Sequence, residues 1–350
     1  MALDMVSSTS ELRFPWSEPP PIGEPALVAP GIFWLRLALP FALDHVNLYL
    51  IEDGAGWAVF DTGLNDAPSR EAWDRVLTGP LGGKPLTRMI VSHFHPDHSG
   101  LAGWLDQRFD LPLYMSRTEY LMSRFLQMDR SSEVERSNVE FYRRAGLDAA
   151  AIEQMLTRGH SYLKRTSGLR PSFIRLSAGD TVTLGGRDWL VLTGGGHAPE
   201  QLMLWCKADR LFLSADQVLA KISPNVSVQP VEPEADPLGQ YLASLSEIRN
   251  QVPDEVLVLP CHNLPFAGLH ARIEQLEAHH HLRCDLIAAA AREPLSCAAV
   301  VPIMFRRPLT DPHQLGFAMG EALAHLNYMR RMGVLTCEVD AGGTLLYRAV

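Results

Sequence analysis

The segment His93-Phe94-His95-Pro96-Asp97-His98 places four potential metal ligands within six residues. Such a cluster would arise by chance on the order of once in a thousand chains of this length. Neutral imidazoles and a carboxylate suit zinc or iron(II) in a hydrolytic site, and the lack of thiolates argues against a closed structural zinc. We therefore expect a catalytic metal centre with open coordination positions. Alternation along the segment should send the first two histidines one way and Asp97 with His98 another.

Four further residues with ligand chemistry stand after predicted strands or turns. They are His197, which follows Gly194-Gly195-Gly196, and Asp61, Asp216 and His262, which follow strand patterns at 56–60, 211–214 and 256–260. Alone, His197 would be interpreted as a surface histidine, Asp216 as a helix N-cap and Asp61 as a turn residue. The position of Asp216 after a buried strand favours metal ligation.

Composition restricts the class of function. The 350 residues are 47% hydrophobic and 20% charged, enough apolar material for one large domain with a smaller appendage. A formal net charge of -9 repels polyanions, so we expect a small-molecule substrate and no nucleic-acid partner. The chain shows no secretory signal and no apolar stretch near the roughly 20 residues of a membrane span, which predicts a cytoplasmic protein without a membrane partner. Five scattered cysteines suit reduced thiols, and only Cys261 adjoins a candidate ligand, His262.

The sequence pattern divides the chain into three parts. Residues 1–25 are Pro-rich and are expected to form an extended arm over the main domain. Residues 26–292 alternate runs of strands with helices, and a Met-rich stretch at about 117–164 predicts an insertion of two or three helices. In 293–350, helix patterns precede two strand patterns around a Gly-rich turn, the outline of a winged-helix-like module. We expect this module to pack on the main domain or to mediate a homodimer.

These features resemble the metallo-β-lactamase superfamily, and the resemblance covers nearly the whole chain. The motifs of that family occur here in order: the Asp61-Thr62-Gly63 turn, the His93 to His98 cluster, His197, Asp216 and His262. The resemblance implies an α+β fold, a four-layer αβ/βα sandwich, to which the helical insertion and the winged-helix-like module are added.

The resemblance also implies a role for each site residue. By analogy, the chain supplies two ligand sets and a bridge: His93, His95 and His197 for one ion, Asp97, His98 and His262 for the other, and Asp216 between them. Asp61 would lie behind the ligands and orient a ligand histidine.

The implied activity is that of a dinuclear zinc hydrolase, with iron or manganese as alternative metals. A metal-bridged hydroxide would cleave a lactone, thioester or ester in a small, partly apolar molecule, and Asp97 or a newly bound water would return a proton to the leaving group. Asp216 favours the glyoxalase II and lactonase branch, because true β-lactamases usually lack a bridging carboxylate. Two alternatives stay open: a mononuclear iron persulfide dioxygenase, and a phosphodiesterase or nuclease of the same superfamily.

Substrate recognition is assigned to apolar residues in and beside the insertion. They are Met115, Tyr120, Leu121, Met122, Phe125, Leu126, Met128, Phe141 and Tyr142. These side chains either form an adaptable wall for an acyl or aromatic group or only pack the helices onto the core. His279-His280-His281 is expected on a solvated helix face, because helical geometry fans three consecutive side chains around the axis. His45, ahead of a strand, could line the pocket.

Overall fold

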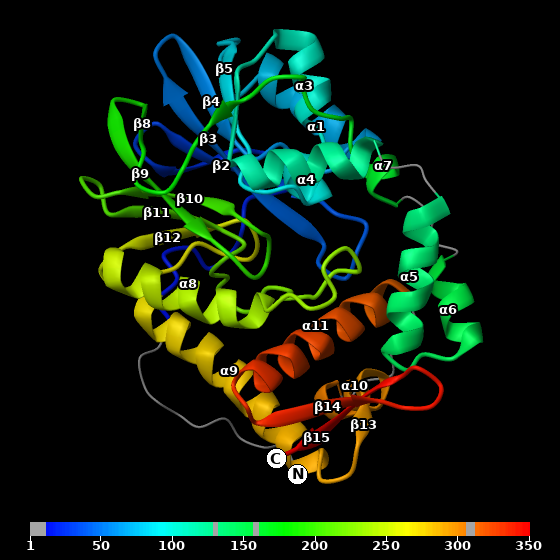
Figure 1. The fold of residues 1–350 in the computed structure, drawn as a ribbon. Helices are drawn as coiled ribbons and strands as arrows, with labels where there is room; N and C mark the ends of the chain where they lie inside the picture. Colours follow the sequence, from blue (N-terminus) through cyan, green and yellow to red (C-terminus); the bar gives the residue numbers. More distant parts are fainter. Residues whose placement is uncertain (1–11, 129–131, 157–160, 306–311) are drawn as a thin grey trace.

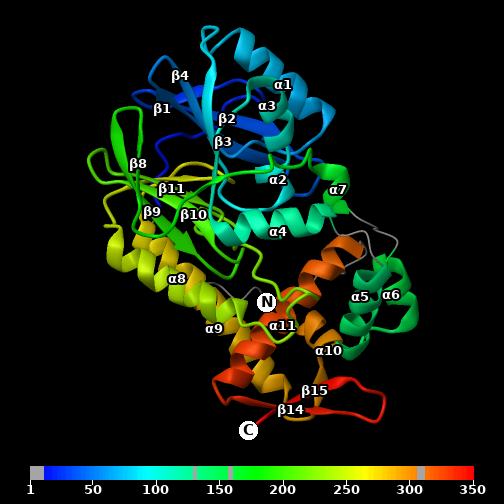
Figure 2. The same cartoon turned by 45° about the horizontal axis from the view of Figure 1, so that its top comes forward.

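Two β-sheets stack face to face in the main part of the protein, with helices on both outer sides (Figures 1 and 2). The computed structural model describes residues 12–128, 132–156, 161–305 and 312–350. The arrangement is the expected α+β sandwich, and a small C-terminal module follows it (Figure 1).

The first sheet contains seven strands in sequential order. They are β1 (Ala26–Ala29), β2 (Ile32–Ala38), β3 (His45–Asp53), β4 (Gly56–Phe60), β5 (Leu86–Ile90), β6 (Leu113–Met115) and β7 (Ile174–Arg175). The first four pair antiparallel and the rest join in parallel. Every residue of β4 is buried, as expected for a strand covered on both faces. Helices α1 (Ala67–Thr78) and α3 (Ala102–Phe109) lie on its outer side (Figure 1).

The second sheet has the order β12-β11-β10-β9-β8. Its strands are β8 (Thr181–Leu184), β9 (Arg187–Gly194), β10 (Gln201–Cys206), β11 (Leu211–Ala215) and β12 (Leu257–Pro260). Helices α8 (Pro237–Gln251) and α9 (Leu269–Ala290) cover its outer face (Figure 2). One apolar cluster fills the space between the two sheets, and a second joins α8 and α9 to the C-terminal module.

The insertion contains four helices in its described part, where the sequence predicted two or three. They are α4 (Arg117–Met128), α5 (Ser132–Arg144), α6 (Ala149–Leu156) and α7 (Ser161–Arg165). Gly146, with φ +89°, lies between α5 and α6, and the Asp148 carboxylate accepts a hydrogen bond from the backbone N–H of Ala151 at 2.8 Å. This N-cap starts α6 after a break at Gly146, which the sequence predicts from the glycine.

The C-terminal module consists of α10 (Cys297–Met304), α11 (Pro312–Arg331) and a three-stranded sheet of order β13-β15-β14. Its strands are β13 (Leu295–Ser296), β14 (Leu335–Val339) and β15 (Leu345–Ala349). The predicted hairpin is present, and β13 is an additional short strand. The winged-helix likeness of this module stays a prediction.

The expectation for the triple histidine was wrong at its central residue. His280 is fully buried between α9 and α11, where its Nδ1 lies 3.2 Å from Nε2 of His325. Only His281 is exposed, because α9 is covered by α8 on one side and α11 on the other. A helix sandwiched in this way buries positions that an isolated amphipathic helix would leave in water.

Candidate metal centre

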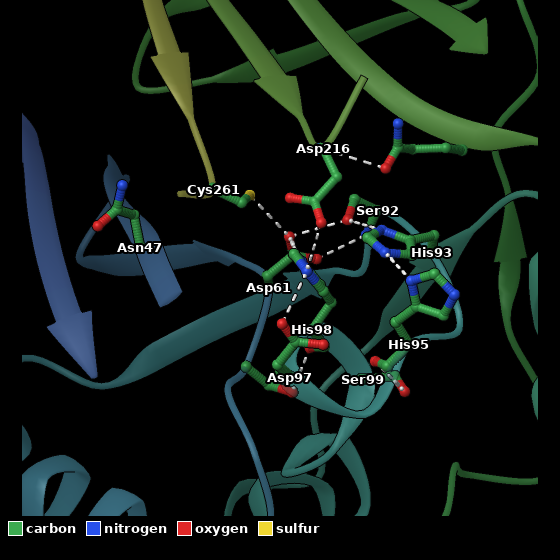
Figure 3. A network of polar contacts seen from close by, with 12 residues as sticks. Asn47, Asp61, Ser92, His93, His95, Asp97, His98, Ser99, Asp216 and Cys261 are labelled. Atoms are coloured by element: carbon green, nitrogen blue, oxygen red, sulfur yellow. Dashed lines mark hydrogen bonds and ion pairs between the residues drawn. The ribbon is translucent and has the colours of Figure 1, made fainter. Parts of the chain in front are cut away.

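All seven predicted ligands converge at one edge of the sandwich, where loops from both sheets meet. Figure 3 shows His93, His95, Asp97, His98 and Asp216. His93 and His95 follow β5, while Asp97 and His98 belong to the short helix α2 (Pro96–Ser99). As predicted, His93 and His95 face one ligand group and Asp97 and His98 another, but a helical turn rather than simple alternation separates the two pairs. Pro96, with its fixed φ, occupies the first position of a helical turn, and this turn directs the following two side chains.

The first group of ligand atoms consists of His93 Nε2, His95 Nδ1 and His197 Nε2. His95 Nδ1 lies 2.9 Å from the His93 nitrogen and 3.1 Å from the His197 nitrogen. His93 Nε2 and His197 Nε2 are 3.3 Å apart. Because the three atoms face a common point, they can serve one ion together.

The second group consists of Asp97 Oδ2, His98 Nε2 and His262 Nε2. The Asp97 oxygen lies 3.5 Å from His98 and 3.4 Å from His262. Asp216 Oδ2 lies between the two groups, 3.3 Å from His197, 3.4 Å from His98 and 3.3 Å from His262. One carboxylate oxygen therefore reaches both groups.

These separations match those of ligands around a small divalent cation. Two ligands bound to zinc at about 2.1 Å with a tetrahedral angle lie about 3.4 Å apart. In addition, His98 Nε2 and Asp216 Oδ1 are buried without a hydrogen-bond partner. Buried polar atoms are normally satisfied, so these atoms and their spacing fit a metal centre.

The charges of the site also suit a cation. Burial and the neighbouring imidazoles lower the pKa of His95 to about 3, so this side chain is neutral. Burial would raise the pKa of Asp97 and Asp216, but the adjacent His98 and His262 hold both pKa values well below their usual range. Burial would lower the pKa of these two histidines, but the carboxylates raise it, for His262 to about 10. Divalent cations would replace these imidazole protons as the positive charge that both carboxylates require.

Asp61 lies behind the ligands, as the sequence predicted. Its Oδ2 accepts from His98 Nδ1 at 2.9 Å, from Ser92 Oγ at 2.8 Å and from the Cys261 thiol at 3.2 Å. Its Oδ1 accepts from the Ser92 backbone N–H at 2.7 Å. Burial and the Asp61 charge raise the pKa of the Cys261 thiol. Cys261 is therefore a neutral donor that helps to hold Asp61. Asp61 orients the His98 ring so that Nε2 faces the metal centre.

Two other ligand histidines are oriented by backbone carbonyls that the sequence did not single out. His197 Nδ1 donates to Asn225 O at 2.8 Å, and His262 Nδ1 donates to His45 O at 2.8 Å. His45 was expected to line the pocket; its ring nitrogens bind Asp44 and the Asn263 N–H instead. A carbonyl carries no side-chain signature, so only the fold could reveal these contacts.

A buried carboxylate of the insertion also contacts the ligand loops and was missed. Glu119 accepts from the backbone N–H of Phe94 at 2.9 Å and from that of Glu200 at 2.7 Å. It is completely buried, and burial raises its pKa to about 7. A glutamate in a charged helical stretch looks like a surface residue, so the sequence held no signal for it.

Comparisons with known proteins agree with this geometry. The sequence profile of the metallo-β-lactamase superfamily matches residues 42–262, which span every candidate ligand. The chain belongs to the metallo-β-lactamase superfamily. A second profile, the metallo-β-lactamase-like C-terminal domain, matches residues 284–350 and begins within α9. None of the curated proteins with which the chain was compared matches it.

Solved structures of other proteins are similar over most of this chain. A β-lactamase domain protein from Burkholderia ambifaria is 40% identical, with a TM-score of 0.90 over 97% of this chain and 98% of its own. A metallo-β-lactamase family protein from Thermus thermophilus is 24% identical, with a TM-score of 0.78 over 93% of this chain and 100% of its own. A stereoselective sec-alkylsulfatase from Pseudomonas sp. shares the fold at 14% identity, with a TM-score of 0.54 over 88% of this chain and 50% of its own.

The family and the clustered ligands together indicate a metal-dependent hydrolase-like protein. Among the residues that the structure describes, no helix combines the length and apolar character that a membrane span requires.

Proposed function

We propose that this chain is a dinuclear zinc hydrolase that cleaves a lactone, thioester or ester bond in a small, partly apolar molecule. The position of Asp216 Oδ2 carries the proposal. This oxygen lies 3.3 Å from His197, in the first ligand group, and 3.4 and 3.3 Å from His98 and His262, in the second. A shared carboxylate with two complete ligand groups supports two ions rather than one.

Two divalent ions held here would lower the pKa of a shared water from 15.7 towards about 7, which supplies a nucleophile at neutral pH. The proton-transfer role falls to Asp97. Its side chain is 20% exposed, against 7% for Asp216, so it is the carboxylate of the site that a substrate can reach. Its lowered pKa keeps it ionised. With ions bound, this carboxylate would take up the proton released from the nucleophilic water and would return it to the leaving group.

The insertion supports a partly apolar substrate. Leu121, Phe125 and Met128 follow a helical i, i+4, i+7 spacing on α4, and their exposed fractions are 56%, 45% and 72%. Other residues of the proposed apolar wall, such as Met115 and Tyr120, are buried in the core. The exposed part of the stripe belongs to a helix that begins beside the metal centre, so we assign it to the apolar portion of the substrate.

Metal analysis and a substrate panel test the proposal. Protein purified without chelators should contain close to two zinc ions per chain and should hydrolyse at least one lactone, thioester or carboxylic ester. Asp216→Asn should lower both metal content and turnover, because the amide offers only one neutral oxygen to the two ions. One iron per chain would favour the dioxygenase alternative, and turnover of phosphodiesters alone would favour the nuclease alternative. Either result would contradict the proposed reaction.

A further inference from the structure

The peptide groups on both sides of Phe94 are held by side chains of the insertion. Phe94 stands between two ligands, His93 and His95. Its N–H donates to Glu119 of α4 at 2.9 Å, and its carbonyl accepts from the Tyr162 hydroxyl of α7 at 2.9 Å. The Phe94 carbonyl also accepts from Ser99 Oγ at 2.8 Å, and Ser92 Oγ lies 2.9 Å from His93 Nδ1. The insertion therefore adds contacts from outside the two sheets to a segment that its neighbours also hold.

Glu119 also holds the loop that carries the third ligand of the same group. Its second oxygen accepts from the backbone N–H of Glu200, three residues beyond His197, at 2.7 Å. The Glu200 carboxylate in turn accepts from the N–H and the hydroxyl of Thr118, at 3.0 and 2.6 Å. The first turn of α4 thus bridges a loop of the first sheet and a loop of the second.

Complete burial gives Glu119 a role that a surface carboxylate could not have. A buried carboxylate is costly unless it is hydrogen-bonded, and here each oxygen has one backbone donor. Tyr162 is anchored too, since its hydroxyl lies 2.7 Å from the Ser123 hydroxyl of α4. The two side chains form a rigid connection between the insertion and the ligand loops.

The second ligand group is held in a different way. His98 donates to Asp61 at 2.9 Å and His262 donates to the carbonyl of His45 at 2.8 Å, and both of these partners belong to the sandwich. The first group also has contacts within the sandwich, since His93 Nδ1 lies 2.9 Å from Ser92 Oγ and His197 donates to Asn225 O. The contacts of Glu119 and Tyr162 are added to these at the first group, whereas the second group is held by Asp61 and the carbonyl of His45.

We propose that Glu119 and Tyr162 are positioning residues for the ion bound by His93, His95 and His197, so that the insertion sets the affinity of that site separately from its neighbour. The inference rests on the proposed two-ion centre. Outer partners of metal ligands typically change metal affinity by about 10–100-fold, and we expect an effect of this size at one site only.

The experiment compares zinc binding by full-length Glu119→Gln and Tyr162→Phe with that of the wild type. In Glu119→Gln, one oxygen remains, and the amide NH2 group faces the other backbone N–H. Chelator-stripped protein is titrated with zinc against a chromophoric chelator, and bound zinc is counted. We expect the wild type to bind two ions and each variant to weaken one of them about 10–100-fold while the other is unchanged.

Two control variants make the result specific. Glu140→Gln removes a carboxylate that is exposed on α5 and bonded to Arg143, and it should leave both sites unchanged. Asp61→Asn should weaken chiefly the ion held by the second group, because Asp61 bonds to His98 directly and reaches His93 only through Ser92. Cobalt substitution would distinguish the two sites, because the first group consists of three imidazoles and the second contains the Asp97 carboxylate.

Unchanged zinc binding in both variants would overturn the inference, as would equal weakening of both sites in folded protein. If circular dichroism shows that Glu119→Gln is unfolded, Tyr162→Phe, which lacks only one hydroxyl, decides alone. If the wild type binds a single ion, the two-ion function fails. The positioning role is then supported when Glu119→Gln weakens that ion and overturned when it does not.

Discussion

Sharp backbone turns at single residues shape the metal centre. Among the described residues, five non-glycine residues have positive φ, and three of them, Asp61, Ala215 and Asn263, adjoin the site. Their φ angles of 65°, 47° and 67° are sparsely populated by L-residues and persist only where the surroundings enforce them. The strain at these positions follows from the need to turn the chain sharply where a strand delivers a ligand or its support.

Gly100 is required near the metal centre because a side chain at this position would collide with neighbouring backbone atoms. A Cβ at this position would lie 2.2 Å from Pro96 O and 2.6 Å from Gly63 O, and both atoms belong to the backbone. We predict that Gly100→Ala lowers the free energy of unfolding by about 1–3 kcal/mol or more and reduces zinc binding, because the turn at Gly63 and helix α2 must separate. Urea denaturation measures the first effect.

Gly79→Ala serves as the comparison for Gly100→Ala. The nearest atom to its Cβ would be Arg75 O at 3.1 Å, and its φ is -117°. Gly79→Ala should therefore change the free energy of unfolding much less than Gly100→Ala does. Equal stability of the two variants would refute the steric explanation.

At the scale of secondary-structure elements, α4 has two faces with different tasks. Glu119 and Ser123 are buried and hold the ligand loops and Tyr162, whereas Leu121, Phe125 and Met128 are exposed. The apolar residues of the insertion therefore do not form one wall, since part of the set packs in the core and part faces solvent.

Phe125→Gln tests the exposed face of α4. Because Phe125 is 45% exposed, stability should stay within about 0.5 kcal/mol of the wild type. We predict that KM for a substrate with an apolar acyl group rises up to about tenfold while kcat changes little, because an aromatic contact contributes about 1 kcal/mol or more. Leu282→Gln, on an exposed position of α9, should leave KM unchanged. If Phe125→Gln also leaves KM unchanged, α4 does not contact the substrate.

The interface of α9 and α11 contains a buried histidine pair. Burial lowers the pKa of His280 to about 2 and that of His325 to about 3, so both rings are neutral in the folded protein. In the unfolded chain, each histidine takes up a proton near pH 6.5. The stability that the neutral pair contributes to the folded protein is therefore fully present above that pH and is lost as pH falls toward about 3. Tyr241 of α8 packs against the His280 ring, and the Arg283–Glu321 ion pair lies close by.

Replacing one histidine of this pair should make stability less dependent on pH. Each buried histidine contributes about 1.4 kcal/mol less to the free energy of unfolding at pH 5.5, one unit below its unfolded pKa, than at pH 7.5. His325→Gln should therefore show a decrease smaller by about 1.4 kcal/mol than that of the wild type in urea denaturation at the two pH values. His281→Gln, at an exposed position of the same histidine run, provides the control. An identical decrease for wild type and His325→Gln would contradict the assignment.

At the scale of the whole molecule, the C-terminal module supports the loop that follows Asp216. The backbone N–H of Val228 donates to Gly320 O of α11 at 3.1 Å, and Asn327 donates to Pro233 O and Ala235 O at 3.0 and 2.9 Å. The same loop provides Asn225 O, the acceptor for His197. The module thus has a packing role that reaches the metal centre, while a homodimer stays a prediction.

Metal removal should destabilise the whole molecule, because the centre joins loops of both sheets. Zinc at about 1,000 times its Kd contributes about 4 kcal/mol. We predict that EDTA lowers Tm by several degrees and that zinc restores it, as followed by differential scanning fluorimetry. Asp216→Asn should show a smaller zinc-dependent shift. A Tm that is insensitive to EDTA in metal-loaded protein would argue against a structural link between the sheets through the ion.

The sequence alone determined the fold family and the candidate ligands. Ligand chemistry resides in side chains, and the histidines and carboxylates stand at fixed places after strongly apolar strands, so their identity and order are visible in one dimension. The same holds for Asp61, which precedes the turn at Gly63.

Only the tertiary structure decided which groups hold these ligands in place. The carbonyls of His45 and Asn225 have no sequence signature, and Glu119 and Tyr162 act across sequence separations that no local pattern encodes. The burial of His280 likewise depends on which helices cover α9. These features arise from packing between distant segments, whereas the ligand motif arises from the local order of strands and turns.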